Sequence, residues 1–144
     1  MPRMIFVNLP VGDVEAAKAF YTAIGFKVNP VFTTEDCASI VVEDNIVLML
    51  LTEKRFQDFI VGDIADRDTT EVLVCVSADS REAVDELCDK ALASGATAWR
   101  DPQDHGAMYG RSFRDLDGHV IEVMWMDVKA ATGLTPEEAI AAAS

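Results

Sequence analysis

The chain has few cysteines, and they lack the close spacing that holds a zinc ion. Cys37, Cys75 and Cys88 are odd in number and far apart, and no Cys-X-X-Cys pair occurs. Each lies in an apolar context, so we expect free thiols that pack as small apolar side chains. Thiols of this kind are typical of a reducing compartment, and we expect a cytoplasmic protein.

Basic residues are also scarce. The chain has 12 Lys and Arg against 25 Asp and Glu, which gives a formal net charge of −13. Unassisted binding to nucleic acid depends on basic side chains that neutralise phosphates, and docking on anionic lipid has the same need. We therefore expect neither nucleic acid nor a membrane surface as a partner.

Long apolar runs are missing too. No stretch approaches the ~20 apolar residues of a membrane-spanning helix. The apolar run after Arg3 is too short for a signal peptide, so we expect no targeting segment. Half of the 144 residues are nevertheless hydrophobic. This composition and length predict one compact domain over residues 1–144.

The most informative stretch that is present covers residues 111–127. Asp115-Leu116-Asp117-Gly118 has turn chemistry, and residues 120–126 form an apolar run rich in β-branched and aromatic side chains. This pattern predicts a hairpin of two strands. One carboxylate, Glu122, stands in the middle of the second strand and shares a face with Val120, Met124 and Met126.

The role of Glu122 depends on what this face meets. A carboxylate among apolar side chains is costly unless a cation, a ligand or a hydrogen-bond donor compensates it. Glu122 is then a candidate catalytic or binding residue of a concave site. The alternative is structural: the side chain is solvated or forms a salt bridge with Arg111 or Arg114 on the neighbouring strand.

The hairpin closes the second of two similar cycles. Each cycle has a strand, a helix that begins near an Asp and ends at a Gly, and then three strands, with Asp13 matching Asp79 and Gly25 matching Gly95. We expect a first βαβββ unit at residues 4–53, a connector at 54–69, a second unit at 70–127 and a tail at 128–144. The fold class is α+β, with a curved, mainly antiparallel eight-stranded cavity and helices outside.

These motifs resemble the vicinal oxygen chelate superfamily, which includes glyoxalases, bleomycin resistance proteins and extradiol dioxygenases. The resemblance is carried by Val11-Gly12-Asp13-Val14, by Ala19-Phe20-Tyr21, by Gly25-Phe26 and by residues 115–123. It implies the duplicated fold and is much less specific for the reaction. It also implies a homodimer, because members commonly pair their units across a chain interface.

In metal-dependent members of this superfamily, ligands come from inward positions on four strands. Carried over to this chain, these positions fall near Phe6, near Met49, on Glu71 and on Glu122. Two carboxylates without imidazole are a poor site for nickel, zinc or iron(II). We expect no cofactor, and at most a weakly held magnesium, calcium or manganese ion on Glu71 and Glu122. We expect Glu71 and Glu122 to point into one cavity, on strands that meet near the centre of the molecule.

Other polar residues are candidates for a small-molecule site. Asn8 shares a face with Phe6, and these two with Met49 are candidate substrate-binding residues. Tyr109 and Arg111 follow the loop that carries His105, so all three are candidates for the cavity mouth. Glu122 and His105 are a chemically reasonable acid–base pair. The structural alternatives are a His105 bonded to its own turn, a Tyr109 in the core and an Arg111 paired with an acid.

Three hypotheses follow. The first is a metal-free cavity that binds or sequesters a small amphipathic molecule, as bleomycin-resistance-like members do. The second is a divalent-metal-dependent lyase, isomerase or dioxygenase that uses Glu71 and Glu122. The third is a structural or regulatory partner protein whose cavity is vestigial. Whether the chain is an enzyme, and which molecule it binds, stay open at this point.

Overall fold

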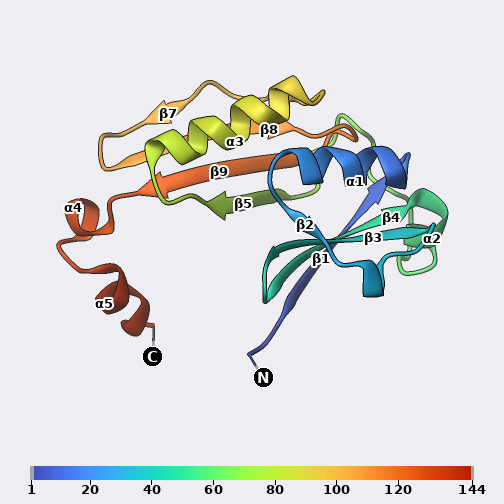
Figure 1. Cartoon of the computed structure of the whole chain (residues 1–144), viewed down its shortest axis with the longest axis horizontal. Coiled ribbons are helices and arrows are strands. Elements are labelled where there is room, and N and C mark those ends of the chain that lie inside the picture. Colours follow the sequence, from blue (N-terminus) through green and yellow to red (C-terminus); the bar gives the residue numbers. More distant parts are fainter. Residues whose placement is uncertain (1, 144) are drawn as a thin grey trace.

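The computed structural model describes residues 2–143 and contains two successive units of the same kind. The first unit has three longer strands, one helix, one short strand and a 3₁₀ turn (Figure 1). Its elements are β1 (Ile5–Val11), α1 (Val14–Ala23), β2 (Lys27–Val28), η1 (Pro30–Phe32), β3 (Cys37–Glu43) and β4 (Ile46–Thr52).

The second unit follows a connector that begins with the short helix α2 (Glu53–Gln57). Its elements are β5 (Leu73–Ser77), α3 (Arg81–Ala93), β6 (Thr97–Ala98), β7 (Gln103–Asp104), β8 (Met108–Arg114) and β9 (Val120–Met126). The tail carries two short helices, α4 (Val128–Thr132) and α5 (Pro136–Ala141). The duplicated order of elements confirms the α+β fold expected from the sequence.

The helix boundaries have local causes. The side chains of Asp13 and Ser80 cap α1 and α3 by accepting hydrogen bonds from the backbone N–H groups of Ala16 and Ala83. Each helix is followed within two residues by a glycine with positive φ, 110° at Gly25 and 107° at Gly95. The Asp-to-Gly pattern of the sequence therefore marks the helices well.

Within residues 2–143 the strands form two mixed sheets and no closed barrel. The first sheet has the order β1-β4-β3-β2 and the second the order β5-β9-β8-β6, with β7 paired to β8. In both sheets the first strand of the unit pairs in parallel with the last, and the remaining pairs are antiparallel. The structure therefore contains the eight expected strands and a ninth, β7, in a segment that the sequence predicted to be a loop.

Capping residues also define the short helical segments. Pro30 starts the 3₁₀ turn η1, with Asn29 as its cap. In the tail, Asp127 caps α4 by accepting from the backbone N–H of Ala130, and Thr135 caps α5 by accepting from that of Glu138.

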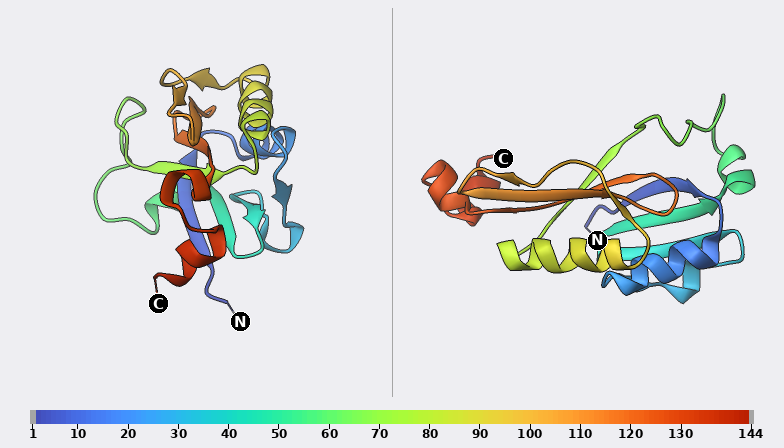
Figure 2. Two further views of the ribbon diagram at one scale, coloured as in Figure 1. Left: turned by 90° about the vertical axis from the view of Figure 1, so that its left-hand side faces the viewer. Right: turned by 90° about the horizontal axis from the view of Figure 1, so that it is seen from above.

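The sheets and helices form two layers. Seen from above, in the right-hand view of Figure 2, α1 and α3 lie together on one side of the strands, and the connector with α2 lies on the other. The core fills the space between strands and helices. It includes Leu9, Phe20, Tyr21, Leu50, Phe113 and Ile121. We call the sheet faces turned away from α1 and α3 the open faces.

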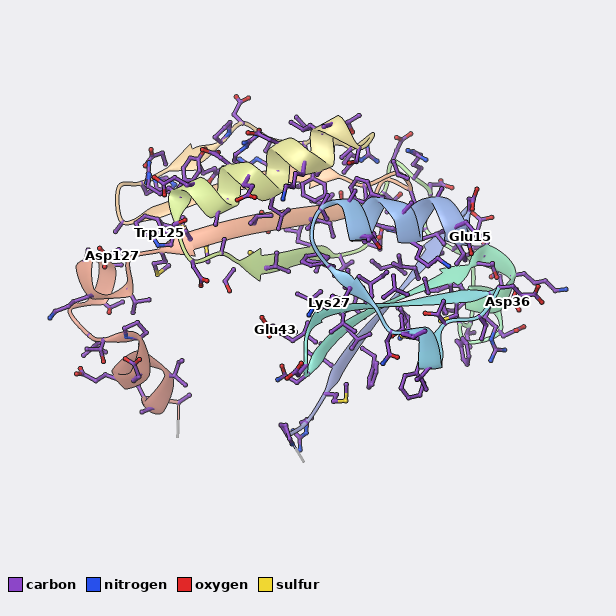
Figure 3. The ribbon with its side chains drawn as sticks, viewed as in Figure 1. Glu15, Lys27, Asp36, Glu43, Trp125 and Asp127 are labelled. Atoms are coloured by element: carbon purple, nitrogen blue, oxygen red, sulfur yellow. The ribbon has the colours of Figure 1, made fainter. Side chains whose placement is uncertain are left out.

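Charged side chains lie mostly outside these layers. Glu15, Lys27, Asp36 and Glu43 are exposed and project from the edges of the first unit (Figure 3). Within the described part of the chain, no helix is long and apolar enough to cross a membrane.

The turn between β8 and β9 joins the second unit to the first. Asp117 accepts a hydrogen bond from the backbone N–H of Gly12 (2.8 Å), and the buried Asp115 accepts one from the Tyr21 hydroxyl (2.5 Å). Asp115 also accepts from the backbone N–H groups of residues 117 and 119. Three acceptor contacts satisfy this buried carboxylate, so its burial is compatible with a stable fold.

His119 completes this junction. Its Nδ1 lies 2.6 Å from a carboxylate oxygen of Glu71, and its Nε2 lies 2.6 Å from the backbone carbonyl oxygen of Pro10. Both partners are acceptors, so only the doubly protonated imidazolium donates to both. We call Pro10, Tyr21, Glu71, Asp115 and His119 the junction cluster. Several of the residues that carry the family resemblance are thus used to hold the two units together.

Candidate functional site

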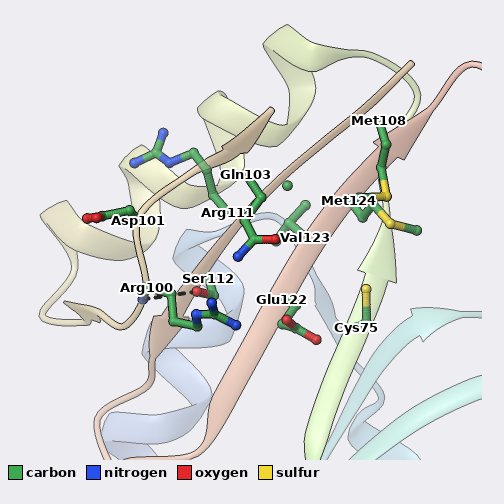
Figure 4. Close-up of a pocket in the computed structure, with 11 residues that line it drawn as sticks. Cys75, Arg100, Asp101, Gln103, Met108, Arg111, Ser112, Glu122, Val123 and Met124 are labelled. Atoms are coloured by element: carbon green, nitrogen blue, oxygen red, sulfur yellow. Dashed lines mark hydrogen bonds between the residues drawn. The ribbon is translucent and has the colours of Figure 1, made fainter. Parts of the chain in front are cut away.

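A pocket of about 130 Å³ lies on the open face of the second sheet (Figure 4). Its base is formed by alternate residues of the β8–β9 hairpin, and Cys75 of β5 lies at one side. Residues 100 to 103, which run from β6 to β7, form the other side. The side chains that border it are those of Cys75, Arg100, Asp101, Gln103, Met108, Arg111, Ser112, Glu122, Val123 and Met124. Figure 4 shows the carboxylate of Asp101 directed away from Glu122.

Strand register brings these side chains together. Gly110 pairs with Met124 and Ser112 pairs with Glu122 across the hairpin, and Cys75 pairs with Glu122 on the other side. Paired residues of neighbouring strands project from the same face. Glu122 therefore stands at the centre of the open face, with a hydroxyl on one side and a thiol on the other.

Two charged groups face this pocket without protein partners. Within residues 2–143, no hydrogen bond or ion pair engages the carboxylate of Glu122 or the guanidinium of Arg100. Figure 4 shows the Arg100 guanidinium extending beneath Ser112 toward the side of Glu122. The backbone N–H of Arg100 donates to the Ser112 hydroxyl (3.2 Å), which fixes the start of this side chain over β8.

The thiol of Cys75 is not activated as a nucleophile. Its pKa is raised, first by burial and then by the negative charge of Glu122. A thiol with a raised pKa stays protonated at neutral pH, and the thiolate is the reactive form. Cys75 therefore contributes a small, weakly polar wall to the pocket.

Tyr109 and Arg111, two predicted substrate-binding residues, are held on the helix-covered face. The Tyr109 hydroxyl donates to Asp85 of α3 (2.6 Å), and Arg111 donates to Asp85 and Asp89 (2.9 Å each). Arg111 also borders the pocket, but its guanidinium is engaged by α3. The hydrogen bond from Tyr109 is the main reason that the pKa of Asp85 is lowered.

His105 and Glu122 are not brought together in the pocket. His105 lies on the loop after β7 and borders a separate, shallow hollow made by residues 99–105. Its backbone N–H donates to the carbonyl oxygen of Met108 (2.9 Å), which closes the β7–β8 turn. The acid–base pair expected from the sequence therefore has no support in this geometry.

Phe6, Asn8 and Met49 lie on the open face of the first sheet. Asn8 pairs with Met49 between β1 and β4, and Phe6 is 54% exposed. Phe6 and Asn8 border a groove whose other wall is α2 and the residues after it. That wall is apolar and consists of Phe56, Phe59 and Ile60. The candidates from the first unit thus belong to a different surface from Glu122.

Glu71 does not share a pocket with Glu122. Its carboxylate is bound to the buried His119 in the junction cluster, and it does not border the cavity around Glu122. The prediction that both carboxylates face one cavity is therefore wrong. Glu71 lies just before β5, where its carboxylate pairs with the imidazole of His119.

Comparisons with known proteins agree with this fold. The family described as bleomycin resistance protein-like N-terminal matches residues 3–43. Among solved structures, the hypothetical protein SA1046 from S. aureus is 28% identical, with a TM-score of 0.74 over 87% of this chain and 95% of that one. A glyoxalase-related enzyme from Fulvimarina pelagi is 21% identical, with a TM-score of 0.73 over 89% and 91% of the two chains.

A third structure points the same way. A glyoxalase/bleomycin resistance protein/dioxygenase family enzyme from Burkholderia phytofirmans is 20% identical, with a TM-score of 0.71 over 87% and 99% of the chains. Comparison with curated proteins finds no match. The N-terminal family match and the duplicated fold support the resemblance of this chain to the vicinal oxygen chelate superfamily.

The residues at the metal positions of vicinal oxygen chelate proteins do not fit a metal here. Phe6 and Met49 offer no donor to a hard cation, and Glu71 is committed to His119. Among residues 2–143, no group of three or more His, Cys, Asp and Glu side chains is placed to hold an ion. Of the four positions that the resemblance indicates, Glu122 alone presents a free carboxylate to the open face.

Reasoning from the sequence missed most of this pocket. Ser112 and Gly110 were within reach, because the turn at Asp115–Gly118 sets the register that pairs Ser112 with Glu122. The same register shows that Tyr109 and Arg111 face the other way. Arg100 lies outside the hairpin, and no local pattern indicates that it approaches Glu122.

Proposed function

We propose that this protein binds a small organic molecule, without a metal, in the pocket around Glu122. The observation that carries the proposal is a recess with two opposite charges, Arg100 and Glu122, that no other described side chain neutralises. Ligand sites are typically recesses with apolar walls and a few polar groups that orient the ligand. Met108 and Met124 supply such walls.

The donor chemistry supports a metal-free site. A transition metal needs three or four convergent donors, but the carboxylate of Glu71 is bonded to a buried imidazole. Using Glu71 as a ligand would leave His119 without one of its two acceptors. The neighbouring groups of Glu122 are a hydroxyl, a thiol with a raised pKa and thioethers. Of these only the hydroxyl oxygen of Ser112 suits a hard divalent cation, which is too few oxygen ligands to hold one tightly.

The names of similar structures leave the choice between binding and catalysis open. One of them is a lactoylglutathione lyase from Agrobacterium tumefaciens, 19% identical to this chain. At this level of identity the similarity concerns the fold. The competing proposal is therefore a divalent-metal lyase, isomerase or dioxygenase that uses Glu71 and Glu122, and it requires the Glu71–His119 pair to separate.

The first test is ligand-induced stabilisation of untagged protein. A library of small organic molecules is screened by thermal melting with EDTA present, and in parallel with nickel, zinc, iron(II) or manganese. We expect an organic ligand to raise the melting temperature in EDTA, because ligand that binds the folded state stabilises it by mass action. Near-stoichiometric metal in the purified protein, with stabilisation by that same ion, would overturn the proposal.

The second test locates the ligand. Amide chemical shifts are followed in ¹⁵N-labelled protein during titration with any compound that stabilises it. We expect the largest shifts at residues 110–112 and 122–124, with small ones at residues 6–8 on the first sheet. The opposite distribution would move the site to the groove beside α2. A screen without any stabilising compound would favour the hypothesis of a partner protein with a vestigial cavity.

A further inference from the structure

Most arginines of the chain are engaged by described residues, and Arg100 is one of the two whose guanidinium groups are not. The chain has seven, and the guanidinium groups of five donate to described residues: Arg55, Arg67, Arg81, Arg111 and Arg114. The other two are Arg3, near the N-terminus, and Arg100. In a chain of net charge −13, acidic partners are abundant. Arg100 nevertheless ends at a pocket with its donors unused by residues 2–143.

Gly110 is the second unexplained feature. It lies in the middle of β8, where glycine weakens a strand, and its φ is not positive. A Cβ built there meets Val123 O alone within 4 Å, at an ordinary contact distance of 3.5 Å. Backbone conformation and packing therefore do not require glycine. What its missing side chain does provide is open space on the pocket floor between Met108 and Ser112.

The pocket is small and its walls are mixed. Its volume of about 130 Å³ is well below the roughly 300–1,000 Å³ of sites for drug-sized ligands. Met108, Met124 and Cys75 give one side a soft apolar surface, and Gln103 and Ser112 add polar groups on the other. A ligand that fills it has a short skeleton and charged or hydrogen-bonding ends.

We infer that the ligand is a small amphoteric molecule of the amino-acid type, with its carboxylate on Arg100 and its protonated amine on Glu122, on either side of Ser112, and with its short apolar chain over Gly110. This inference rests on the proposed function and specifies its ligand class. Guanidinium and carboxylate form charge-assisted hydrogen bonds with complementary geometry. An ammonium group on the ligand supplies the cation that Glu122 lacks, and a short alkyl chain packs on the methionines.

The test uses four matched probes: norvaline and 5-aminopentanoate carry both charges, whereas pentanoate and pentylamine carry one each. Binding is measured by ¹⁵N chemical-shift titration at constant ionic strength. We expect at least one amphoteric probe to bind about tenfold or more tightly than both single-charge probes, as expected when a charge-assisted contact is added. Equal affinity for pentanoate or pentylamine would overturn the inference.

Charge-removing variants assign each end of the ligand. Arg100→Gln is expected to erase the advantage of the better amphoteric probe over pentylamine, and Glu122→Gln to erase its advantage over pentanoate. Arg55→Gln and Glu86→Gln make the same charge changes at exposed ion pairs on α2 and α3. These controls are expected to keep the wild-type preference. Loss of preference in the controls would attribute the effect to net charge and overturn the inference.

Gly110 gives an independent test. Gly110→Val is expected to lower probe affinity at least tenfold while the melting temperature is unchanged or higher, because valine suits a strand and the Cβ position is free. Unchanged binding would remove Gly110 from the site and overturn the inference. If the amphoteric probes fail but another library compound shifts residues 110–112 and 122–124, the ligand class is wrong and the proposed function stands. If no compound of any class binds, both fail.

Discussion

At the scale of single residues, His119 shows how a motif histidine can serve the fold. Burial lowers its pKa, but the charge of Asp115, the carbonyl of Pro10 and the carboxylate of Glu71 outweigh burial and raise it. The surroundings therefore favour the charged form of the imidazole in the folded state. Its two short contacts, 2.6 Å each, reach the first unit at Pro10 and the segment before β5 at Glu71.

The raised pKa of His119 predicts how stability depends on pH. Since its pKa in the fold lies above the ordinary 6.5, its proton stabilises the folded state. This contribution is complete below about pH 6.5 and is lost as pH rises through the folded-state pKa. We expect the free energy of unfolding in urea to fall from pH 6 toward pH 9, and His119→Gln to reduce it by ~1–3 kcal/mol at pH 6.

The control for this prediction is the second of the two histidines, His105, which lies on an exposed loop. His105→Gln should keep the wild-type slope of stability against pH, whereas His119→Gln should flatten it. A wild-type slope in His119→Gln would assign the pH dependence to other groups and contradict the junction role.

The sequence could place residues whose contacts are local, but not residues whose partners lie far away along the chain. Glu122 was placed correctly among its neighbours on the strand, because side-chain alternation is local. Tyr109 and Arg111 were predicted at the cavity mouth, but the register of the hairpin turns both side chains to the helix-covered face. The contact between His119 and Pro10 spans 109 positions, and no periodicity within one element can predict it.

At the scale of elements, the β8–β9 hairpin has two roles at once. Its strands carry Gly110, Ser112, Glu122 and Met124 into the pocket, and its turn docks on the first unit. The connector fastens the turn from outside, since Arg67 donates to the carbonyl oxygen of Leu116 (2.8 Å). The sequence identified the turn and both strands, but it indicated neither the docking of the connector nor the strand β7.

Gly118 in this turn is predicted to be sensitive for two separable reasons. Its φ is +88°, and a Cβ there would lie 2.8 Å from Arg67 Cγ. Gly62 on the connector has a similar φ of +97° with nothing within 4 Å. We expect Gly62→Ala to cost ~1 kcal/mol through backbone strain, and Gly118→Ala to cost a further ~1–3 kcal/mol through the clash. Urea unfolding of both variants measures the difference, and equal losses would show that Arg67 yields without cost.

At the scale of the whole molecule, the apolar surface is unevenly distributed. Within residues 2–143, β1 and β5 each pair with one strand, and each lies at one edge of its sheet; the opposite edges are formed by the short strands β2 and β6. Large hydrophobic side chains are exposed along these edges, with Ile5 at 58%, Phe6 at 54% and Leu73 at 49%. Exposed strand edges with apolar side chains favour pairing with another chain.

We propose that two copies of this chain associate through the edges of β1 and β5. Each copy carries a net charge of −13, so repulsion opposes association and salt should strengthen it by screening. We expect light scattering at micromolar concentration to give the mass of a dimer at 150 mM salt. Ile5→Lys and Leu73→Lys place charges on these edges and should shift the mass toward the monomer, whereas Val61→Lys, at a fully exposed position of the connector, should not. A monomer mass for the wild-type chain at high salt and at the highest protein concentration tested would contradict the proposal, because neither charge repulsion nor dilution would then explain the absence of association.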